Sequence, residues 1–366
     1  MLALAPTWLG AGRFSRHALR RAVGPDPVTA PEDYAARVDA LAEEQGPLVV
    51  YSGQEASLDA LLAASEERPE RLILPYATPS ALERVRDKRL LAEYCTWVGL
   101  KYPKTLFSGT ASELLAGEVA PPFMLKPAQA GGSLTRVLPI ATTGELHRQL
   151  TSIPLDEPLL VQERLSGPLT AVALVLDETG SVLARFQQVA RRTWPPGAGP
   201  SSFAVSVPPD EDLISRSARL LAEVGYSGLA QLQFVGPRGA QALIDVNTRF
   251  YGSLPLALSA GVNLPAVWHA SVTGLPIPPL APYRVGVSYR ALRADIAAAL
   301  HGMPRLLFER GRKPRVGSMW ARDDPLASVV LAASVAGRRL RRTVRAQHGR
   351  HDGAPPKSRP GSRPWR

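Results

Sequence analysis

The sequence predicts a protein of mixed α/β and α+β architecture with more than one domain, and three observations lead to this prediction. The chain has 366 residues, enough for two or three separate cores. Its first 85 residues alternate short apolar runs with helical segments, which is typical of a parallel sheet covered by helices. Between residues 87 and 274, strand-like runs follow one another through turns, which indicates mostly antiparallel pairing.

The N-terminal region, residues 1–85, is expected to form a small α/β domain. Its pattern repeats three times as a short apolar run followed by a helical segment. The strands are predicted at 2–5, 48–51 and 72–74, and the helical segments at 10–21, 54–64 and 79–86. A further strand should lie between the first two, and Val28 lies near its expected position.

Residues 86–275 form the second predicted domain, with subdomains of about 86–160 and 161–275. Helices are expected over 88–98, from Thr143 and over 211–224. Apolar runs bounded by turn residues predict strands at 123–126, 137–140, 159–163, 170–176, 184–189, 229–234 and 241–246. The last two strands flank a Gly-Pro-Arg-Gly turn and should form a hairpin.

The C-terminal part divides into a mixed segment, 276–345, and a basic tail, 346–366. The tail is rich in Pro, Gly and Arg and has almost nothing to bury, so we expect it to be disordered. The net charge of the chain is +11, and residues 338–366 alone contribute nine arginines, Lys357 and Asp352. The remaining chain is therefore nearly neutral, and the basic composition says little about its site.

The cysteine usage and the apolar stretches bound the cellular location. The one cysteine, Cys95, excludes an internal disulfide, fits a reducing cytoplasm and lies in a helical apolar pattern typical of a core. The longest suspicious apolar stretch, 326–337, has 12 residues and is too short to span a bilayer. At the N-terminus apolar residues precede basic ones, the reverse of a secretory signal. We therefore predict a cytoplasmic protein without a transmembrane segment.

The strongest chemical signal is the segment 242–265, where a strand ends in Asp245, Asn247 and Arg249 before a Gly-Ser turn and an apolar helix. Alternation places these three side chains on one face of the strand end. Two oxygen donors suit Mg²⁺, and an arginine beyond them suits a phosphoryl group in transfer. The alternative is a surface strand with a local Asp–Arg pair.

This strand end resembles the E-x-N-x-R motif of the ATP-grasp superfamily, which includes D-alanine–D-alanine ligase, biotin carboxylase and carbamoyl phosphate synthetase. The resemblance implies that Asp245 and Asn247 bind Mg²⁺ (or Mn²⁺) and that Arg249 holds phosphate and acyl-phosphate oxygens. Asp245 is one methylene shorter than the usual glutamate. Gln233 takes the place of the second metal ligand and offers a neutral oxygen. The alternative for Gln233 is a strand glutamine that faces solvent.

A second signal is the segment from Phe123, in which Lys126 ends an apolar strand and a glycine-rich loop follows. Glycines let backbone N–H groups approach phosphates, while the lysine supplies a point charge. The loop resembles the K-P-x-x-x-x-G-S loop of the ATP-grasp superfamily, and alone it could be an ordinary turn. The resemblance implies that Lys126 binds the α- and β-phosphates of ATP and that the loop residues cover them, namely Gly131, Gly132 and Ser133.

Two further segments match the same superfamily. Arg86-Asp87-Lys88 resembles its D-K entry, which implies a nucleotide-binding role for Lys88; the alternative is a solvated lysine on a helix surface. The strand 159–163 resembles the hinge between the two subdomains. The resemblance implies that adenine is bound there by Gln162, Glu163 and Leu165.

Four arginines remain undecided at this level. Arg191 and Arg192 lie in a loop between strands beside the predicted site, where they either bind substrate or γ-phosphate or are solvated. Arg290 and Arg293 follow a strand-like run and either bind a substrate carboxylate or have a structural role.

Taken as an ATP-grasp enzyme, the chain is expected to be an ATP-dependent, carbon–nitrogen bond-forming ligase. It would activate a small-molecule carboxylate as an acyl phosphate, which an amine or other nucleophile attacks, with Lys126, Mg²⁺ and Arg249 neutralising the transferred group. The alternative is a nucleotide-binding protein with a degenerate site that binds nucleic acid or anionic membrane through its basic C-terminus. The sequence also leaves open a weak anionic partner for the tail and a homodimer.

Overall fold

The computed structural model describes residues 1–65, 71–128, 134, 137–197, 199–308, 315–318, 320–321 and 323–334. The chain divides into two compact units. One combines residues 1–26 with the residues from 319 onward, and the other comprises residues 27–318. The boundaries expected near residues 85, 160 and 275 stay predictions.

The smaller unit contains a two-stranded parallel sheet, in which β1 (Leu2–Ala5) pairs with β2 (Arg20–Val23). The connection is a single 3₁₀ turn, η1 (Ala11–Phe14), so the helix expected over 10–21 is wrong. The missing strand is β2, which ends well before Val28. Ala22 is its one buried residue, and its two arginines are exposed, so the strand has no hydrophobic pattern from which it could be predicted. A helix at 325–334 completes the described part of this unit.

The larger unit begins with α1 (Pro31–Gln45), β3 (Leu48–Val49), α2 (Glu55–Ser65), β4 (Leu72–Ile73) and α3 (Pro79–Arg86). The strands β3 and β4 are parallel, as expected, but each has only two residues. The described strands of the first 85 residues thus form two separate pairs and not the single small sheet that the pattern predicts.

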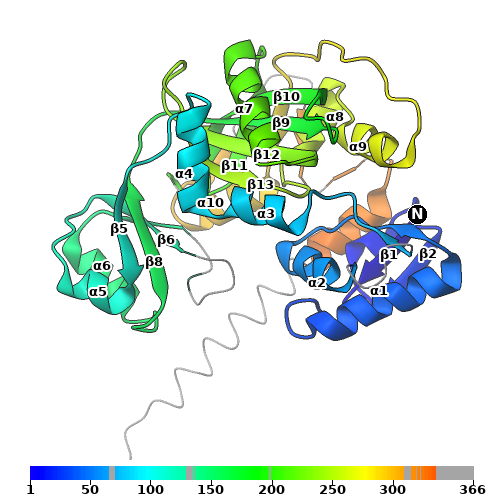
Figure 1. Ribbon diagram of the computed structural model, residues 1–366, viewed down its shortest axis with the longest axis horizontal. Helices are drawn as coiled ribbons and strands as arrows, with labels where there is room; N and C mark the ends of the chain where they lie inside the picture. The colour runs from blue at the N-terminus through cyan, green and yellow to red at the C-terminus, as the bar shows by residue number, and fades with distance from the viewer. Residues whose placement is uncertain are drawn as a thin grey trace, which may run out of the picture. The chain divides into compact units, whose positions relative to one another are not determined.

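A four-stranded antiparallel sheet follows helix α4 (Lys88–Trp97), with strand order β5-β8-β6-β7. Helices α5 (Ala111–Ala116) and α6 (Thr143–Leu150) cover one of its faces, as Figure 1 shows. Phe123, Leu125 and Val161 form its core with these helices. The strands are β5 (Thr105–Thr110), β6 (Phe123–Pro127), β7 (Leu138–Ile140) and β8 (Pro158–Glu163). Strand β5 escaped prediction because it is a half-exposed edge strand without apolar alternation.

A seven-stranded sheet with the order β13-β12-β9-β10-β11-β14-β15 forms the centre of the larger unit. Its pairs are antiparallel except for β14 and β15. The strands are β9 (Leu169–Leu176), β10 (Val182–Thr193), β11 (Ser201–Ser206), β12 (Gly228–Val235), β13 (Ala242–Asn247), β14 (Ser288–Arg290) and β15 (Arg315–Gly317). The mostly antiparallel α+β architecture and the β12–β13 hairpin are therefore confirmed.

The central strand β9 supplies side chains to two cores because alternate residues face opposite sides. Val172, Leu174 and Leu176 pack with α4 and α7 (Glu211–Glu223). Ala173 and Val175 pack with α8 (Leu254–Ala260) and α9 (Leu264–Thr273). Helix α10 (Leu292–Leu300) and the 3₁₀ turn η2 (Pro304–Leu307) follow β14. Both faces of the sheet are thus buried, which holds its strand ends in place.

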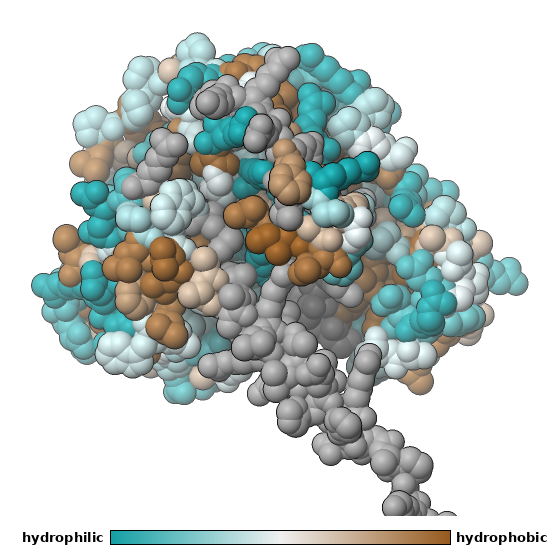
Figure 2. All heavy atoms as spheres, turned by 180° about the vertical axis from the view of Figure 1, so that it is seen from behind, coloured by the Kyte–Doolittle hydropathy of each residue, from teal (hydrophilic) through white to brown (hydrophobic). Residues whose placement is uncertain are grey.

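The one cysteine lies in a core, as the sequence predicts. Cys95 is fully buried, and its desolvation raises the thiol pKa to about 12, as expected for a core residue. Figure 2 shows hydrophobic side chains in separate patches among hydrophilic ones on one face. Within the described residues, no helix is both long and apolar enough to cross a membrane.

Candidate functional site

A cleft of about 1180 Å³ in the larger unit brings together most of the predicted site residues. The four-stranded sheet contributes residues from β6 and β8, and the seven-stranded sheet contributes residues from β10, β12 and β13. Eight of the predicted residues line it: Lys88, Lys126, Gln162, Glu163, Leu165, Gln233, Asp245 and Asn247. The predicted loop residues Gly131, Gly132 and Ser133 lie outside the described residues.

The floor of the cleft is the end of the β12–β13 hairpin. Gln233 lies directly opposite Asp245, and Gln231 lies opposite Asn247, so four oxygen-bearing side chains occupy neighbouring positions. The Asn247 amide donates to Asp245 Oδ2 over 3.4 Å, and the Gln233 amide donates to Gln231 Oε1 over 3.4 Å. Both donors are Nδ2 or Nε2 atoms, which leaves the amide oxygens of Asn247 and Gln233 available.

A β-bulge in β13 provides the point at which a lysine of the four-stranded sheet contacts this floor. The pairing shifts between Gln233 and Phe234, which makes Ile244 the extra residue of β13. Lys126 reaches from β6 and donates from Nζ to the Ile244 carbonyl over 3.4 Å. The buried Lys126 amine has its pKa lowered to about 8, by desolvation and by the nearby charge of Lys88, while Asp245 opposes the shift.

Lys88 reaches the cleft as the first residue of α4. Asp87 caps this helix, because its carboxylate accepts the backbone N–H groups of Arg89 and Leu90. The cap fixes where α4 begins and so aims Lys88 toward Lys126. Two cations and one carboxylate, Asp245, thus meet at the same end of the cleft.

The Asp245 carboxylate is exposed to the cleft, yet protein surrounds it on its other sides. Desolvation raises its pKa, Lys126 and Lys88 lower it, Glu55 raises it, and Arg249 lowers it. The net direction is upward. No cation among the described residues lies within ion-pair distance of it. Its charge is therefore available to a cation that enters the cleft.

The strand β8 presents Gln162 and Glu163 to the cleft. The Glu163 carboxylate accepts the Lys104 backbone N–H over 2.8 Å, and the Glu163 N–H donates to the Lys104 carbonyl over 2.9 Å. Gln162 is fully buried, and its amide has no well-aligned hydrogen bond among the described residues. A polar neighbour is the Tyr102 hydroxyl, which also lines the cleft; burial raises the pKa of Tyr102, and its contact with Gln162 lowers it in part. Buried polar groups with unused hydrogen-bonding capacity indicate a ligand at this position.

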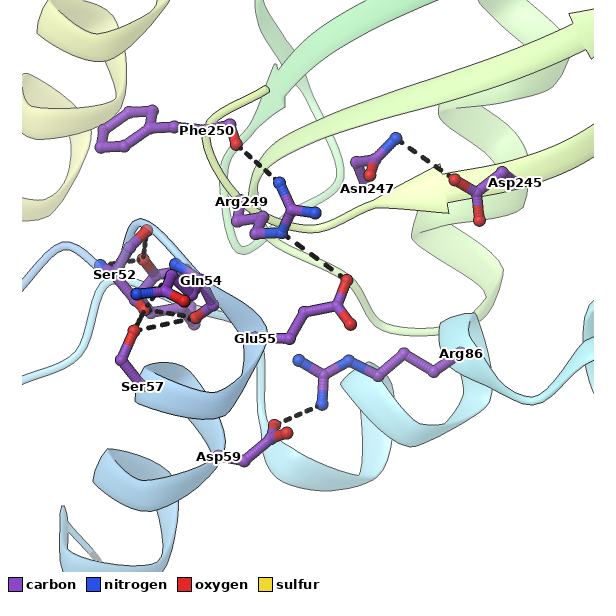
Figure 3. A network of polar contacts seen from close by, with 11 residues as sticks. Ser52, Gln54, Glu55, Ser57, Asp59, Arg86, Asp245, Asn247, Arg249 and Phe250 are labelled. Carbon is purple, nitrogen blue, oxygen red and sulfur yellow. Dashed lines mark hydrogen bonds and ion pairs between the residues drawn. The ribbon is translucent and has the colours of Figure 1, made fainter. Parts of the chain in front are cut away.

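Arg249 lies beyond the strand, since β13 ends at Asn247, and strand alternation alone therefore does not orient it. Figure 3 shows its guanidinium turned toward Glu55 at the start of α2. Its Nη1 donates to the Phe250 carbonyl over 3.0 Å, and its Nε lies 3.6 Å from Glu55 Oε1. One turn further along α2, Asp59 accepts a hydrogen bond from Arg86 over 2.6 Å. Sequence reasoning missed Glu55, because nothing in the local pattern links the first residue of α2 to the strand end that precedes Arg249.

The undecided arginines separate clearly in the structure. Arg192 and Arg290 both bond to the fully buried carboxylate of Asp295, and Arg192 Nε also donates to Ser202. Arg290 further donates to the Leu306 carbonyl. These contacts indicate a structural role for Arg290. Arg192 also bonds to Asp295 but lines the cleft, as Arg191 does. Arg191 and Arg192 belong to strand β10, which runs to Thr193, so the prediction that they lie in a loop is wrong.

The chain has the ATP-grasp fold. Residues 156–294 match the family described as ATP-grasp in the biosynthetic pathway with Ter operon. No curated protein matches the chain. The resemblance to the ATP-grasp superfamily expected from the motifs is confirmed by this match and by similar solved structures.

Three of these structures show the extent of the similarity. The biotin carboxylase domain dimer of Hydrogenobacter thermophilus 2-oxoglutarate carboxylase, solved with MgADP, ADP and bicarbonate, shares 18% identity and a TM-score of 0.57, with coverage of 75% of this chain and 65% of that one. Campylobacter jejuni biotin carboxylase shares 15% identity and a TM-score of 0.58, with coverage of 75% of this chain and 65% of that one. The L-amino acid ligase of Bacillus licheniformis shares 17% identity and a TM-score of 0.55, with coverage of 69% of this chain and 63% of that one. The chain thus spans just under two thirds of the length of these proteins, and identities this low establish the fold alone.

The residues present fit a nucleotide with a divalent cation. The amide of Gln162, which has no well-aligned hydrogen bond among the described residues, offers a donor and an acceptor to a base, and Lys126 and Lys88 offer positive charge to phosphates. Asp245 with the amide oxygens of Asn247 and Gln233 supplies the hard oxygen donors that Mg²⁺ prefers. The set contains a single carboxylate.

Proposed function

We propose that the protein is an ATP-dependent ligase that activates a small-molecule carboxylate as an acyl phosphate, which an amine then attacks. The observation that supports this most is the convergence of Lys126, Lys88, Gln162 and Asp245 from separate elements on one cleft of the ATP-grasp fold. Each of these side chains has unused capacity for a charged or polar ligand.

The proposed roles follow from position. Gln162 with the β8 backbone, Glu163 and Leu165 binds the base at one end of the cleft. Lys126 and Lys88 bind the phosphates. A bound Mg²⁺ supplies charge neutralisation between phosphate oxygens, and Asp245, Asn247 and Gln233 are the residues that would hold it.

Arg249 is proposed to stabilise the phosphoryl group as it moves to the substrate carboxylate. It lies two residues past Asn247, and its Nη2 has no hydrogen-bond partner among the described residues. A planar guanidinium can bind two phosphoryl oxygens at once. No protein nucleophile is required for this chemistry, because the substrate carboxylate is the attacking group.

No finding favours the alternative of a degenerate nucleotide site with an anionic partner at the basic tail, and we do not propose it. The tail lies outside the described residues. The cytoplasmic location and a homodimer stay predictions; the H. thermophilus domain, with the same fold, was solved as a dimer.

Two measurements test the proposal. Calorimetric titration should show ATP binding that depends on Mg²⁺ or Mn²⁺, because polyphosphate and Asp245 need a cation between them. Equal affinity in excess chelator would contradict the metal assignment. A screen of amino acids and small carboxylates, in pairs with amines, should then identify combinations that release ADP. If no pair accelerates ADP release above the rate with ATP alone, the ligase proposal is wrong.

A further inference from the structure

Glu55 is the feature of the cleft that phosphoryl transfer does not explain. It is the first residue of α2 and lines the cleft at the end that also holds Arg86 and Lys88. Its side chain keeps 48% of its surface exposed. It is the only acid at this end of the described cleft lining besides the metal-facing Asp245.

The contact between Glu55 and Arg249 is loose. The 3.6 Å between Oε1 and Nε is too long for a hydrogen bond, and Arg249 already donates to the Phe250 carbonyl. An exposed ion pair of this kind contributes little to stability. Glu55 therefore retains most of its hydrogen-bonding capacity, and so does the arginine.

The charge of Glu55 is unfavourable for the ligands considered so far. It contributes to the raised pKa of Asp245, and it repels both the phosphates of ATP and a substrate carboxylate. An acidic residue in the first turn also stabilises a helix. That benefit needs no position inside the cleft, and it leaves the second carboxylate oxygen unused.

We propose that Glu55 binds the ammonium group of the substrate, and that the carboxylate activated by this protein belongs to an amino acid. This inference rests on the proposed ligase function. Glu55 and Arg249 present a negative and a positive group side by side. In an α-amino acid one carbon separates the ammonium from the carboxylate, so the two charges can meet both partners together. The ammonium replaces the loose contact of Glu55 with Arg249 and frees the guanidinium for the reacting group.

The experiment compares matched substrates that differ only in the amino group: L- and D-alanine against propionate, and L- and D-phenylalanine against 3-phenylpropionate. Hydroxylamine serves as the nucleophile, because it traps an acyl phosphate as a hydroxamate whatever the natural amine is. ADP and hydroxamate are measured in parallel. We expect turnover with at least one amino-bearing member to exceed that with its amine-free partner by tenfold or more.

Variants at Glu55 separate substrate recognition from a structural role. Glu55→Gln should raise the KM for the amino-bearing substrate about tenfold, leave the KM for ATP unchanged and remove the preference over the amine-free partner. Glu55→Asp should keep part of that preference. Glu43→Gln is the control, since Glu43 forms a 2.8 Å ion pair with Arg71 away from the cleft; it should behave as the unchanged protein. Melting temperatures of all three variants establish that they fold.

Three results would overturn the inference, and they are distinguishable from each other. Equal turnover of amino-bearing and amine-free partners contradicts it directly, while the ligase proposal survives. An equal fall of kcat for both partners in Glu55→Gln shows that Glu55 only positions Arg249. If none of the carboxylates yields ADP or hydroxamate, the inference falls together with the proposed function.

Discussion

Two aspartates lie near the same cleft, each with two cations close by, and their surroundings differ. Asp295 is fully buried and bonds directly to Arg192 and Arg290. Asp245 is open to the cleft, and although Lys126 and Lys88 influence its pKa, no ion pair joins it to either of them. The first charge is satisfied within the protein, and the second remains available for a ligand.

This difference follows from the two kinds of cation. Arginine offers a planar fork that bonds to a carboxylate at a fixed geometry, so Asp295 can be buried between two of them. Lysine is a flexible point charge, and Lys126 donates to the Ile244 carbonyl instead. An aspartate held by arginines therefore indicates structure, whereas an aspartate left beside lysines indicates a place where charge is neutralised by something else.

The largest effect that this comparison predicts is on stability. Asp295→Asn should lower the free energy of unfolding by about 3 kcal/mol, because it leaves two partly buried guanidinium groups without their counterion. Asp245→Asn should leave stability nearly unchanged, since its carboxylate is already destabilised by desolvation. Urea unfolding of both variants measures this. A larger loss for Asp245→Asn would reverse our assignment of the two sites.

The second prediction concerns turnover. Arg249→Lys should lower kcat on the order of 10²-fold with little change in nucleotide affinity, since lysine cannot bind two phosphoryl oxygens at once. Arg238→Lys is the control: Arg238 is an exposed arginine paired with Asp210. Steady-state ADP release and nucleotide titration give the two numbers. If Arg249→Lys shifts only the KM for ATP, Arg249 binds the ground state and is not the phosphoryl clamp.

The third prediction uses the pKa of Lys126, which burial lowers to about 8 from the usual 10.5. The protonated amine binds phosphates, so MgADP affinity should be full below pH 8. Above pH 8 the free protein loses this proton. The dissociation constant of MgADP should then rise about tenfold per pH unit, until the pH approaches the ordinary lysine pKa of 10.5. Calorimetry from pH 7 to 9.5 measures the slope. Lys126→Arg keeps its charge throughout this range, so the slope should vanish there; an unchanged slope would assign the titration to another group.

The smallest predicted effect concerns Gln233, whose neutral amide lies opposite Asp245. Gln233→Glu adds a second carboxylate to the floor of the cleft, so Mn²⁺ binding in the presence of ADP should tighten about fivefold. Electron paramagnetic resonance of free Mn²⁺ measures the affinity and the number of ions bound. Unaltered affinity would show that Gln233 does not face the metal.

The features of this protein that depend on short-range rules could be predicted from the sequence alone. Strand alternation and turn chemistry predicted a hairpin whose second strand carries Asp245, and the hairpin is found. The bulge at Ile244, which these rules do not predict, is what brings Asp245 opposite Gln233. Apolar periodicity located α4 and α7 almost to the residue. The ATP-grasp motifs predicted the fold, because their spacing reflects strands that begin and end at fixed places.

The meeting of charges that are distant in sequence could be seen only in the folded chain. Glu55 and Arg249 are separated by almost two hundred residues. Arg192 and Asp295 are also far apart in the sequence, by 103 residues. Such contacts depend on the packing of whole sheets and helices, which no local pattern encodes. The short strand β2 belongs to the same class, since its arginines disguise a strand that exists because β1 lies beside it. Local chemistry thus predicted the candidate metal ligands, and packing determined which charges stay available to a ligand.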